Sequence, residues 1–559
     1  MSKVLLLGGG IAGMSAAMEL CEDHDVVIVE RRSIAGGKAR TWIDGDFNVF
    51  REHSFRVFHS TYHNTFDTMT RVSTGPGRTI RNDLVPFVSK ADLQATGSDT
   101  VTRWLRSATE GTRVGWRERA RLGVDAVRLL GVLSASDERL NGLLGDATFE
   151  EVFLRRDDGS RGLLFQGLKD MSQVEYSADR VHPDVKVMLN FVEKHFMHGL
   201  PGLAWNATVG PTSDIYIEPW KQHLLDRGVT FRHDLDVVEL ALDQAANRIT
   251  GVRVAPTAGG RSRWLRPDHV VSALPSDIIH GLADRHLQRA APELRTIGEV
   301  RRVWNNGVIV YNDRPIRVIG GYYMWHPWRV AVTSYANRWR EPFDLSGHGL
   351  GATKGAIGDV ISYVITDWFA PGPHTGKPAA DCTPDELYDE LCWMGLEDPS
   401  VMPGFDPRHH VHPANAAGET VRCMVDGSLV YGDDGRIVEN EDTLAHLPAG
   451  YSLRMPGAAT GVDNLFLAGC HVHNAFGCGD SMEGANETGR RAANAILAAE
   501  GATRRAMILE GRRASLGVKA FDVLRTVDRA LYRLVPIGRG KPGAPGGGDA
   551  AASVDEVAA

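Results

Sequence analysis

A chain of 559 residues is too long for one hydrophobic core and predicts two or three domains. Its composition is that of an ordinary soluble protein, and its net charge of −8 argues against a nucleic-acid partner, because nucleic-acid-binding domains are basic. No apolar run reaches the roughly 18 residues of a transmembrane helix. Six sparse cysteines without paired metal spacing indicate reduced thiols, so we expect a cytoplasmic protein.

The first 30 residues have the pattern of a dinucleotide-binding βαβ unit. The apolar run 4–7 predicts a buried strand, residues 8–13 form G-x-G-x-x-G, and residues 14–21 predict a helix whose N-terminus receives phosphates. A second strand, 26–29, ends on Glu30, whose carboxylate can accept hydrogen bonds from both hydroxyls of an adenosine ribose. The cofactor-binding residues predicted here are Gly8, Gly10, Ile11, Ala12, Gly13 and Glu30.

A second glycine pair follows the acid, in residues 33–41, SIAGGKART. This stretch resembles the GG motif of the flavin-containing amine oxidase and phytoene desaturase superfamily, in which it extends the pyrophosphate site of FAD. The resemblance therefore implies FAD, because NAD domains do not normally carry this extension. The residues that it implies for the cofactor site are Arg31, Gly36, Gly37, Lys38, Ala39 and Arg40.

The segment 42–64 comes next, and in the resembling superfamily it passes alongside the isoalloxazine ring. Its aromatic, histidine-containing pattern is similar to that of plant-type phytoene and ζ-carotene desaturases. His53 and Arg56 are candidate catalytic residues facing the flavin or the substrate, and an arginine there would stabilise negative charge on the reduced ring. A hydrogen-bonded loop without a catalytic role is the alternative.

A second strong motif occupies residues 463–497. A buried strand ends at Gly469, and a helix is predicted from Ser481 in SMEGANETGRRAA, which closely resembles the C-terminal FAD signature of the same superfamily. The resemblance implies that amides near Met482 and Glu483 point at the flavin C2 carbonyl. Relatives commonly have an acid after this glycine. The candidates between strand and helix are Cys470, which stands in place of that acid, and His471 and His473, one of which is predicted to contact the substrate.

Strand and helix patterns between the two motifs imply a discontinuous nucleotide-binding domain. The predicted fold class is α/β, with a mostly parallel Rossmann-like sheet built from residues 1–90, 201–290 and 441–500. The superfamily pattern places a valine backbone against adenine, and Val237 holds that position. The other predicted parts are an inserted α+β substrate domain (91–200 and 291–440), a helical C-terminal extension (501–536) and a disordered tail (537–559).

Several stretches outside the motifs allow two interpretations. Aromatic residues concentrated between 303 and 369 form either the floor of an apolar cavity or an ordinary core. The basic helical stretches 99–134 and 502–534 are candidates for contact with the inner membrane face, with packing on the protein's own surface as the alternative. The HHVH sequence at 409–412 has no further ligands nearby, so no metal site is predicted.

The chain as a whole resembles bacterial phytoene-desaturase-like and hydroxysqualene-dehydroxylase-like flavoproteins. This implies FAD-dependent oxidoreduction of an apolar isoprenoid or polyene substrate, with hydride transfer from an allylic carbon to flavin N5 and electrons passing to an unidentified acceptor. One alternative is an amine or amino-acid oxidase, which the absence of lysine between Arg301 and Asn312 disfavours. The others are a redox-neutral flavin isomerase and, more remotely, a prenyl-binding protein that is not an enzyme.

Overall fold

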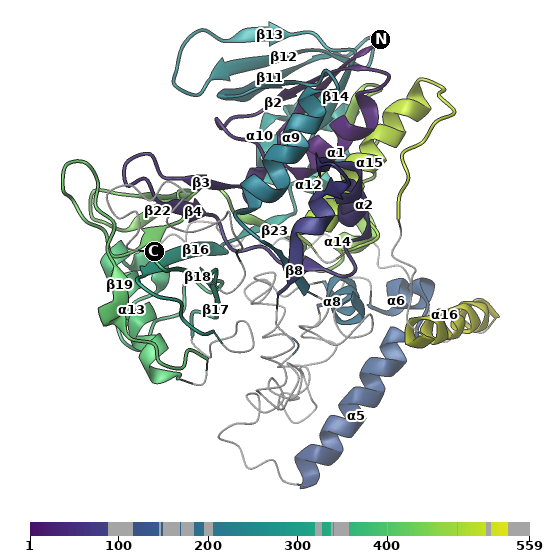
Figure 1. Cartoon of the computed structure of the whole chain (residues 1–559). Coiled ribbons are helices and arrows are strands. Elements are labelled where there is room, and N and C mark those ends of the chain that lie inside the picture. The colour runs from purple at the N-terminus through teal and green to yellow at the C-terminus, as the bar shows by residue number, and fades with distance from the viewer. Residues whose placement is uncertain are drawn as a thin grey trace.

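A five-stranded parallel sheet organises the upper part of the molecule in Figure 1. The computed structural model describes residues 1–87, 116–144, 147–148, 168, 184–194, 205–318, 327–336, 339, 357–399, 401–477, 479–509 and 516–534. The sheet has the order β10-β2-β1-β14-β24, so strands from the beginning, middle and end of the chain lie side by side. Its strands are β1 (Lys3–Leu7), β2 (Asp25–Val29), β10 (Thr230–Arg232), β14 (His269–Ser272) and β24 (Leu465–Leu467).

Both faces of this sheet are covered, which explains why its strands are apolar without alternation. Val4 and Leu6 of β1 belong to a core shared with helices on one face, whereas Leu5 and Leu7 belong to a core on the other. The helices of the first face are α1 (Ile11–Leu20), α2 (His63–Arg71), α9 (Glu218–Leu225) and α15 (Met482–Ala499). The second face carries β11 (Leu235–Asp243), β12 (Arg248–Pro256), β13 (Arg263–Leu265), α10 (Ser276–Leu282), α11 (Arg285–Ala290) and α12 (Glu293–Ile297).

Glycines allow the elements around β1 to approach closely. A Cβ atom at Gly13 of α1 would lie 2.0 Å from the carbonyl oxygen of Gly8, and one at Gly489 of α15 would lie 2.3 Å from that of Ala12. Only glycine fits at either position. The first contact is the close packing of helix on strand that the third glycine of the fingerprint predicts.

A second, antiparallel sheet lies at the left of Figure 1 and has the order β17-β18-β16-β19, with β20 also paired to β16. One of its faces packs on α13 (Pro384–Glu397), and the other packs on the segment around Phe50. Every residue of β16 and β18 is buried, as expected for strands covered on both faces. Its strands are β16 (Asn306–Asn312), β17 (Val330–Ser334), β18 (Asp359–Ile365), β19 (His410–Val411) and β20 (Met424–Val425).

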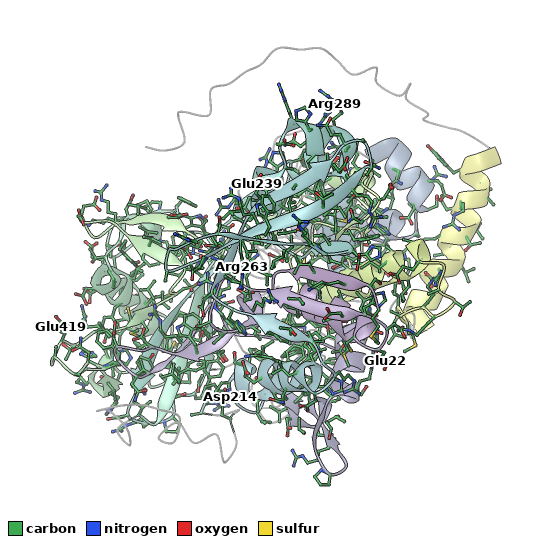
Figure 2. The ribbon with its side chains drawn as sticks, turned by 90° about the horizontal axis from the view of Figure 1, so that it is seen from above. Glu22, Asp214, Glu239, Arg263, Arg289 and Glu419 are labelled. Carbon is green, nitrogen blue, oxygen red and sulfur yellow. The ribbon has the colours of Figure 1, made fainter. Side chains whose placement is uncertain are left out.

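Short elements connect these layers. Figure 2 shows charged side chains at the periphery of the molecule, such as Arg289 of α11 and Glu419 of a loop. The short strands are β3 (Thr41–Ile43), β4 (Phe50–Glu52), β5 (Phe58–His59), β6 (Ser73–Gly75), β7 (Arg78–Thr79), β8 (Leu84–Pro86), β9 (Trp205–Thr208), β15 (Arg301–Val303), β21 (Leu429–Tyr431), β22 (Ile437–Asn440) and β23 (Leu444–His446). The short helices are η1 (Gly37–Ala39), η2 (Ile80–Asp83), η6 (Ser213–Ile217), η8 (Ala379–Asp381), η9 (Pro407–His409) and α14 (Tyr451–Arg454).

Four further helices, α5 (Trp116–Leu133), α6 (Asp137–Leu144), α8 (Val185–Val192) and α16 (Leu516–Leu534), lie below the parallel sheet in Figure 1. None of the helices in the described ranges is long and apolar enough to cross a membrane. The predictions for residues 99–115 and for the tail 537–559 lie outside the described residues, and the predicted helical insertion between 148 and 198 is described only in part.

Candidate active site

A cavity of about 400 Å³ lies between the two sheets. It opens at the carboxyl ends of the parallel strands, where Gly8 follows β1, Glu30 follows β2 and Gly469 follows β24. Ala331 of β17 and Val364 of β18 form part of the opposite wall. In open α/β sheets, ligands bind at the carboxyl ends of the strands, so this cavity is the candidate active site.

The glycine fingerprint forms one end of the cavity. Gly8 has φ +104°, and a Cβ atom there would lie 2.9 Å from the carbonyl oxygen of Ala273. Gly10 is the N-cap of α1 and supplies no side chain to cap it, while Gly10, Ile11 and Ala12 line the cavity. The first amides of α1 are therefore available to an anion, as a phosphate site at a helix N-terminus requires.

Glu30 stands at the adjacent strand end and is almost fully buried. Its carboxylate accepts hydrogen bonds from the backbone amides of Gly9 (2.8 Å) and Arg32 (2.9 Å), which fix its orientation at the cavity wall. Arg31 and Val237 line the same region, as the predicted ribose and adenine contacts require. A carboxylate has about four lone-pair positions, so two amides leave room for ribose hydroxyls.

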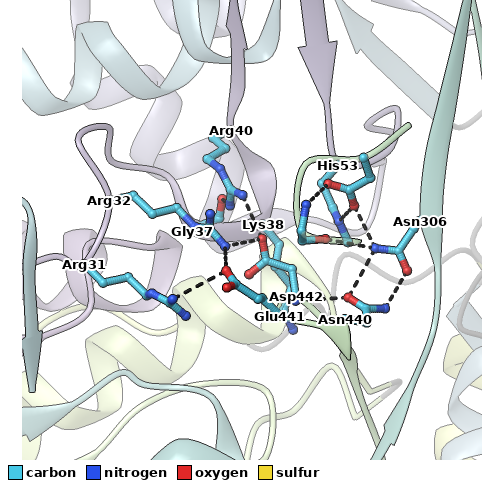
Figure 3. Close-up of polar contacts among 12 residues, drawn as sticks. Arg31, Arg32, Gly37, Lys38, Arg40, His53, Asn306, Asn440, Glu441 and Asp442 are labelled. Carbon is cyan, nitrogen blue, oxygen red and sulfur yellow. Dashed lines mark hydrogen bonds and ion pairs between the residues drawn. The ribbon is translucent and has the colours of Figure 1, made fainter. Parts of the chain in front are cut away.

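The basic residues of the GG motif are paired with acids. The Lys38 ammonium donates to Asp480 Oδ2 at 2.6 Å. The Arg40 guanidinium donates to Asp442 Oδ2 at 2.7 Å (Figure 3). Burial opposes ionisation of Asp442, but Arg40 and Arg32 overcome it and hold its pKa well below the usual range. Arg40 is buried and lies outside the cavity lining, which corrects its predicted place beside the phosphates.

The uncapped α1 amides therefore remain as donors for a diphosphate beside these neutralised cations. Gly37, Lys38 and Ala39 do line the cavity. Asp480 lines the cavity too. Burial alone would raise the pKa of its carboxyl group, but the charge and hydrogen bond of Lys38 outweigh burial, so the pKa is lowered. Asp480 and Asp442 were missed by the sequence analysis, although Asp480 directly precedes the predicted helix start and offered a signal.

Cys470 connects the end of β24 to the start of α15. Its thiol donates to the carbonyl of Ser481 and accepts from the amide of Ser481, both at 3.2 Å. Burial raises the pKa of Cys470 well above its usual value, so the group is a neutral thiol. The predicted cofactor residues Gly469, Cys470, Ser481 and Met482 all line the cavity.

The side chain of Glu483 has a structural role at the start of α2. Its side chain points to α2, where it accepts from the amides of Asn64 and Thr65, each at 2.9 Å. It thereby caps the N-terminus of α2 and lies outside the cavity lining. The predicted contact concerns the backbone amides near Met482 and Glu483, and it stays a prediction.

Three of the four predicted catalytic residues meet in the cavity. Arg56 donates to Lys38 O and Ser54 Oγ, and His53 and His471 are buried with no hydrogen-bond partner at Nε2. Burial lowers the pKa of His471 to about 4, so this ring is neutral at physiological pH. His473 is exposed and outside the lining, which corrects its predicted substrate contact.

Apolar side chains line the part of the cavity nearest the antiparallel sheet. They are Phe55, Val57, Tyr62, Ala331 and Val364. The described aromatic residues between 303 and 369 pack mainly into two hydrophobic cores. None of them lines the cavity, so for these residues the ordinary-core interpretation holds and the cavity-floor interpretation is wrong. His410 of the HHVH sequence contacts the hydroxyl of Tyr388 at 2.6 Å, and the described residues contain no cluster of metal ligands.

Comparisons with known proteins match both ends of this site. Residues 7–72 match the model of the NAD(P)-binding Rossmann-like domain, and residues 439–497 match that of the flavin containing amine oxidoreductases. The chain is 22% identical over 519 residues to the zeta-carotene desaturase of Synechocystis sp., covering 89% of this chain and 97% of that protein. A stretch of 89 residues is 36% identical to the zeta-carotene desaturase of Capsicum annuum, covering 16% and 15% of the two chains.

A solved structure of similar fold is an oxidoreductase from Methanosarcina mazei, with a TM-score of 0.50, 15% identity, and coverage of 87% of this chain and 98% of the other. Together with the parallel sheet, these matches confirm the predicted α/β, Rossmann-like fold class. They also identify the cofactor as a flavin and the protein as an oxidoreductase. These matches support a place for the chain in the superfamily of flavin-containing amine oxidoreductases and carotenoid desaturases.

Proposed function

We propose that this protein is an FAD-dependent desaturase of an apolar, polyene substrate. The observation that carries the proposal is the single cavity that joins the nucleotide-binding residues Gly8, Gly10 and Glu30 to the apolar wall of Phe55 and Val364. A dinucleotide flavin would lie with its adenosine at Glu30 and its ring toward Met482. The adjoining apolar wall would then receive a substrate that offers no polar groups.

The residues at the end of β2 and at the start of α1 fit the adenosine half of FAD. Glu30 at the end of β2 and the uncapped N-terminus of α1 suit a ribose and a diphosphate, which FAD contains and FMN lacks. Gly10 and Gly37 leave space beside the diphosphate, because a Cβ atom at Gly10 would contact only Gly37. FAD is therefore the flavin that these residues fit.

The substrate class rests on the cavity wall and on the relatives. The residues that line the far end are aromatic, aliphatic or small, and the two relatives compared above are zeta-carotene desaturases. A bound flavin supplies a two-electron acceptor that can take a hydride from a carbon next to a double bond. The protein would hold the substrate so that this carbon faces the flavin, which is chiefly a task of position and shape.

The test uses the full chain loaded with FAD and mixed without oxygen with ζ-carotene in detergent. We expect the flavin that is released on denaturation to be FAD by chromatography, and we expect ζ-carotene to bleach the oxidised-flavin absorption band as a more unsaturated product forms. Reoxidation with oxygen or a quinone then identifies the electron acceptor.

Other outcomes would contradict the proposal. Bleaching by amines but not by polyenes would make the protein an amine oxidase, and an altered double-bond geometry without bleaching would make it an isomerase. A protein that cannot be loaded with FAD would be a binding protein instead.

A further inference from the structure

His53 and Asp426 form a buried pair at the edge of the cavity. His53 Nδ1 lies 2.5 Å from Asp426 Oδ2, and both side chains are at most 1% exposed. The two residues are 373 positions apart in the chain and are brought together where the segment after β4 crosses β16. A buried carboxylate this close to an imidazole fixes both the position and the charge preference of the ring.

The carboxylate is itself held in place. Asn306 Nδ2 donates to Asp426 Oδ2 at 2.7 Å, and the amide of Ser428 donates to Oδ1 at 3.1 Å. Asn306 is fixed in turn by Asn440, whose Nδ2 donates to Asn306 Oδ1 at 2.7 Å (Figure 3). Asp426 therefore has no freedom to turn away from His53.

This arrangement determines which nitrogen of His53 is reactive. Since the ionised Asp426 accepts a hydrogen bond from Nδ1–H, the neutral ring carries its lone pair on Nε2. Nε2 is buried without a hydrogen-bond partner, and His53 is among the residues that line the cavity. An unpartnered buried acceptor is costly unless a ligand uses it.

We propose that His53 Nε2 accepts the proton released in desaturation and that Asp426 is the positioning residue that prepares it. The inference rests on the proposed function. As the substrate loses a hydride to the oxidised flavin, the adjacent carbon loses a proton to His53, and the electron pair of that C–H bond becomes the new C=C bond. His53 then releases its proton to solvent, so the protein returns to its starting state.

Two ionised carboxylates lie in the electrostatic surroundings of His53. Burial raises the pKa of Asp426, but the charge and hydrogen bond of His53 outweigh it and leave the pKa lowered, so the carboxylate is ionised. Asp442 is a second ionised carboxylate in the electrostatic surroundings of His53, and Arg56 and Glu52 are the other charged or titratable groups nearby. His471 differs, because burial lowers its pKa to about 4 and it would hold a proton poorly.

The experiment compares His53→Gln and Asp426→Asn with His473→Gln, a matched control at an exposed histidine outside the cavity. In anaerobic single turnovers with ζ-carotene, we expect product formation to slow by roughly 10²- to 10⁴-fold in His53→Gln, the usual contribution of a general base. Asp426→Asn should slow it by about 10- to 100-fold, as loss of an orienting partner does. The control should match the wild type.

One readout separates this role from a structural one. In the wild type, ¹H NMR should show a far-downfield Nδ1 proton that disappears in His53→Gln and Asp426→Asn and persists in the control. FAD affinity should be unchanged in all three variants.

The outcomes are distinguishable from those for the proposed function. A wild-type protein that ζ-carotene does not reduce overturns both proposals. Reduction and product formation at equal rates in wild type and His53→Gln overturn only the role of His53. If Asp426→Asn does not fold, absence of the downfield Nδ1 proton from the wild-type spectrum still overturns the pairing.

Discussion

The Glu30 carboxylate is the residue from which the cofactor site can best be tested. We expect Glu30→Gln to weaken FAD binding by roughly 10- to 100-fold, because a hydrogen bond to a charged group contributes about 1.5–3 kcal/mol. Gln retains one carbonyl oxygen, so one of the two amides, of Gly9 or Arg32, keeps its acceptor and the fold should persist. FAD titration by fluorescence gives the dissociation constant. Glu239→Gln, on an exposed strand of the same half, is the control.

Residues close together in the chain were the ones that sequence could assign. The Gly8 turn and Glu30 depend on local backbone geometry, which the pattern of strand, glycines and acid predicts. The partner of Arg40 is Asp442 and the partner of His53 is Asp426, and both acids lie hundreds of residues away. Nothing local distinguishes a cation that binds phosphate from one neutralised by a distant carboxylate.

At the scale of elements, α16 is amphipathic as expected, but its polar face rather than its apolar face packs against the rest of the protein. Its polar side packs inward, through Arg529 to Glu138 (2.9 Å) and Asp528 to Arg139 (2.8 Å). On the apolar face of the helix, Leu524, Val527 and Leu531 are instead about half exposed, although Phe521 packs on the core. Periodicity predicts that a helix has an apolar face, but it does not determine what that face contacts.

We propose that this exposed apolar face of α16, defined by Leu524, Val527 and Leu531, lies on a membrane surface. Replacing all three by Ser should abolish most sedimentation with phosphatidylglycerol-containing vesicles, since each buried apolar side chain contributes about 1.5–3 kcal/mol. Thermal stability should change little, because the three side chains are already exposed. Equal sedimentation of this variant and of a Val430→Ser, Val438→Ser control would contradict the proposal.

In the molecule as a whole, two partly buried ion pairs join distant parts of the chain around the cavity. Lys38 and Arg40, after the fingerprint, reach Asp480 and Asp442, which flank the last strand of the parallel sheet. The parallel sheet could be predicted, since its strands are continuous apolar runs next to recognisable motifs. The junction with the antiparallel sheet could not, because it depends on contacts between segments without a shared local pattern.

The Arg40–Asp442 pair makes stability depend on pH in a testable way. Because the pKa of Asp442 is lowered in the folded protein, the pair stabilises the fold above the unfolded pKa of about 3.9, and this contribution disappears as pH falls through the folded pKa. Asp442→Asn should lower the free energy of unfolding at pH 7 by about 3–5 kcal/mol, because it leaves Arg40 buried and unpaired. Below about pH 4 the unfolded chain protonates at Asp442 while the folded protein stays ionised, so the gap should begin to narrow there and close further as pH approaches the lowered folded pKa. Denaturant unfolding of both proteins at pH values from 7 to below 4 measures this difference in the free energy of unfolding, with Asp46→Asn at an exposed position as control. A difference that does not change with pH would show that Asp442 does not carry the charge assigned to it.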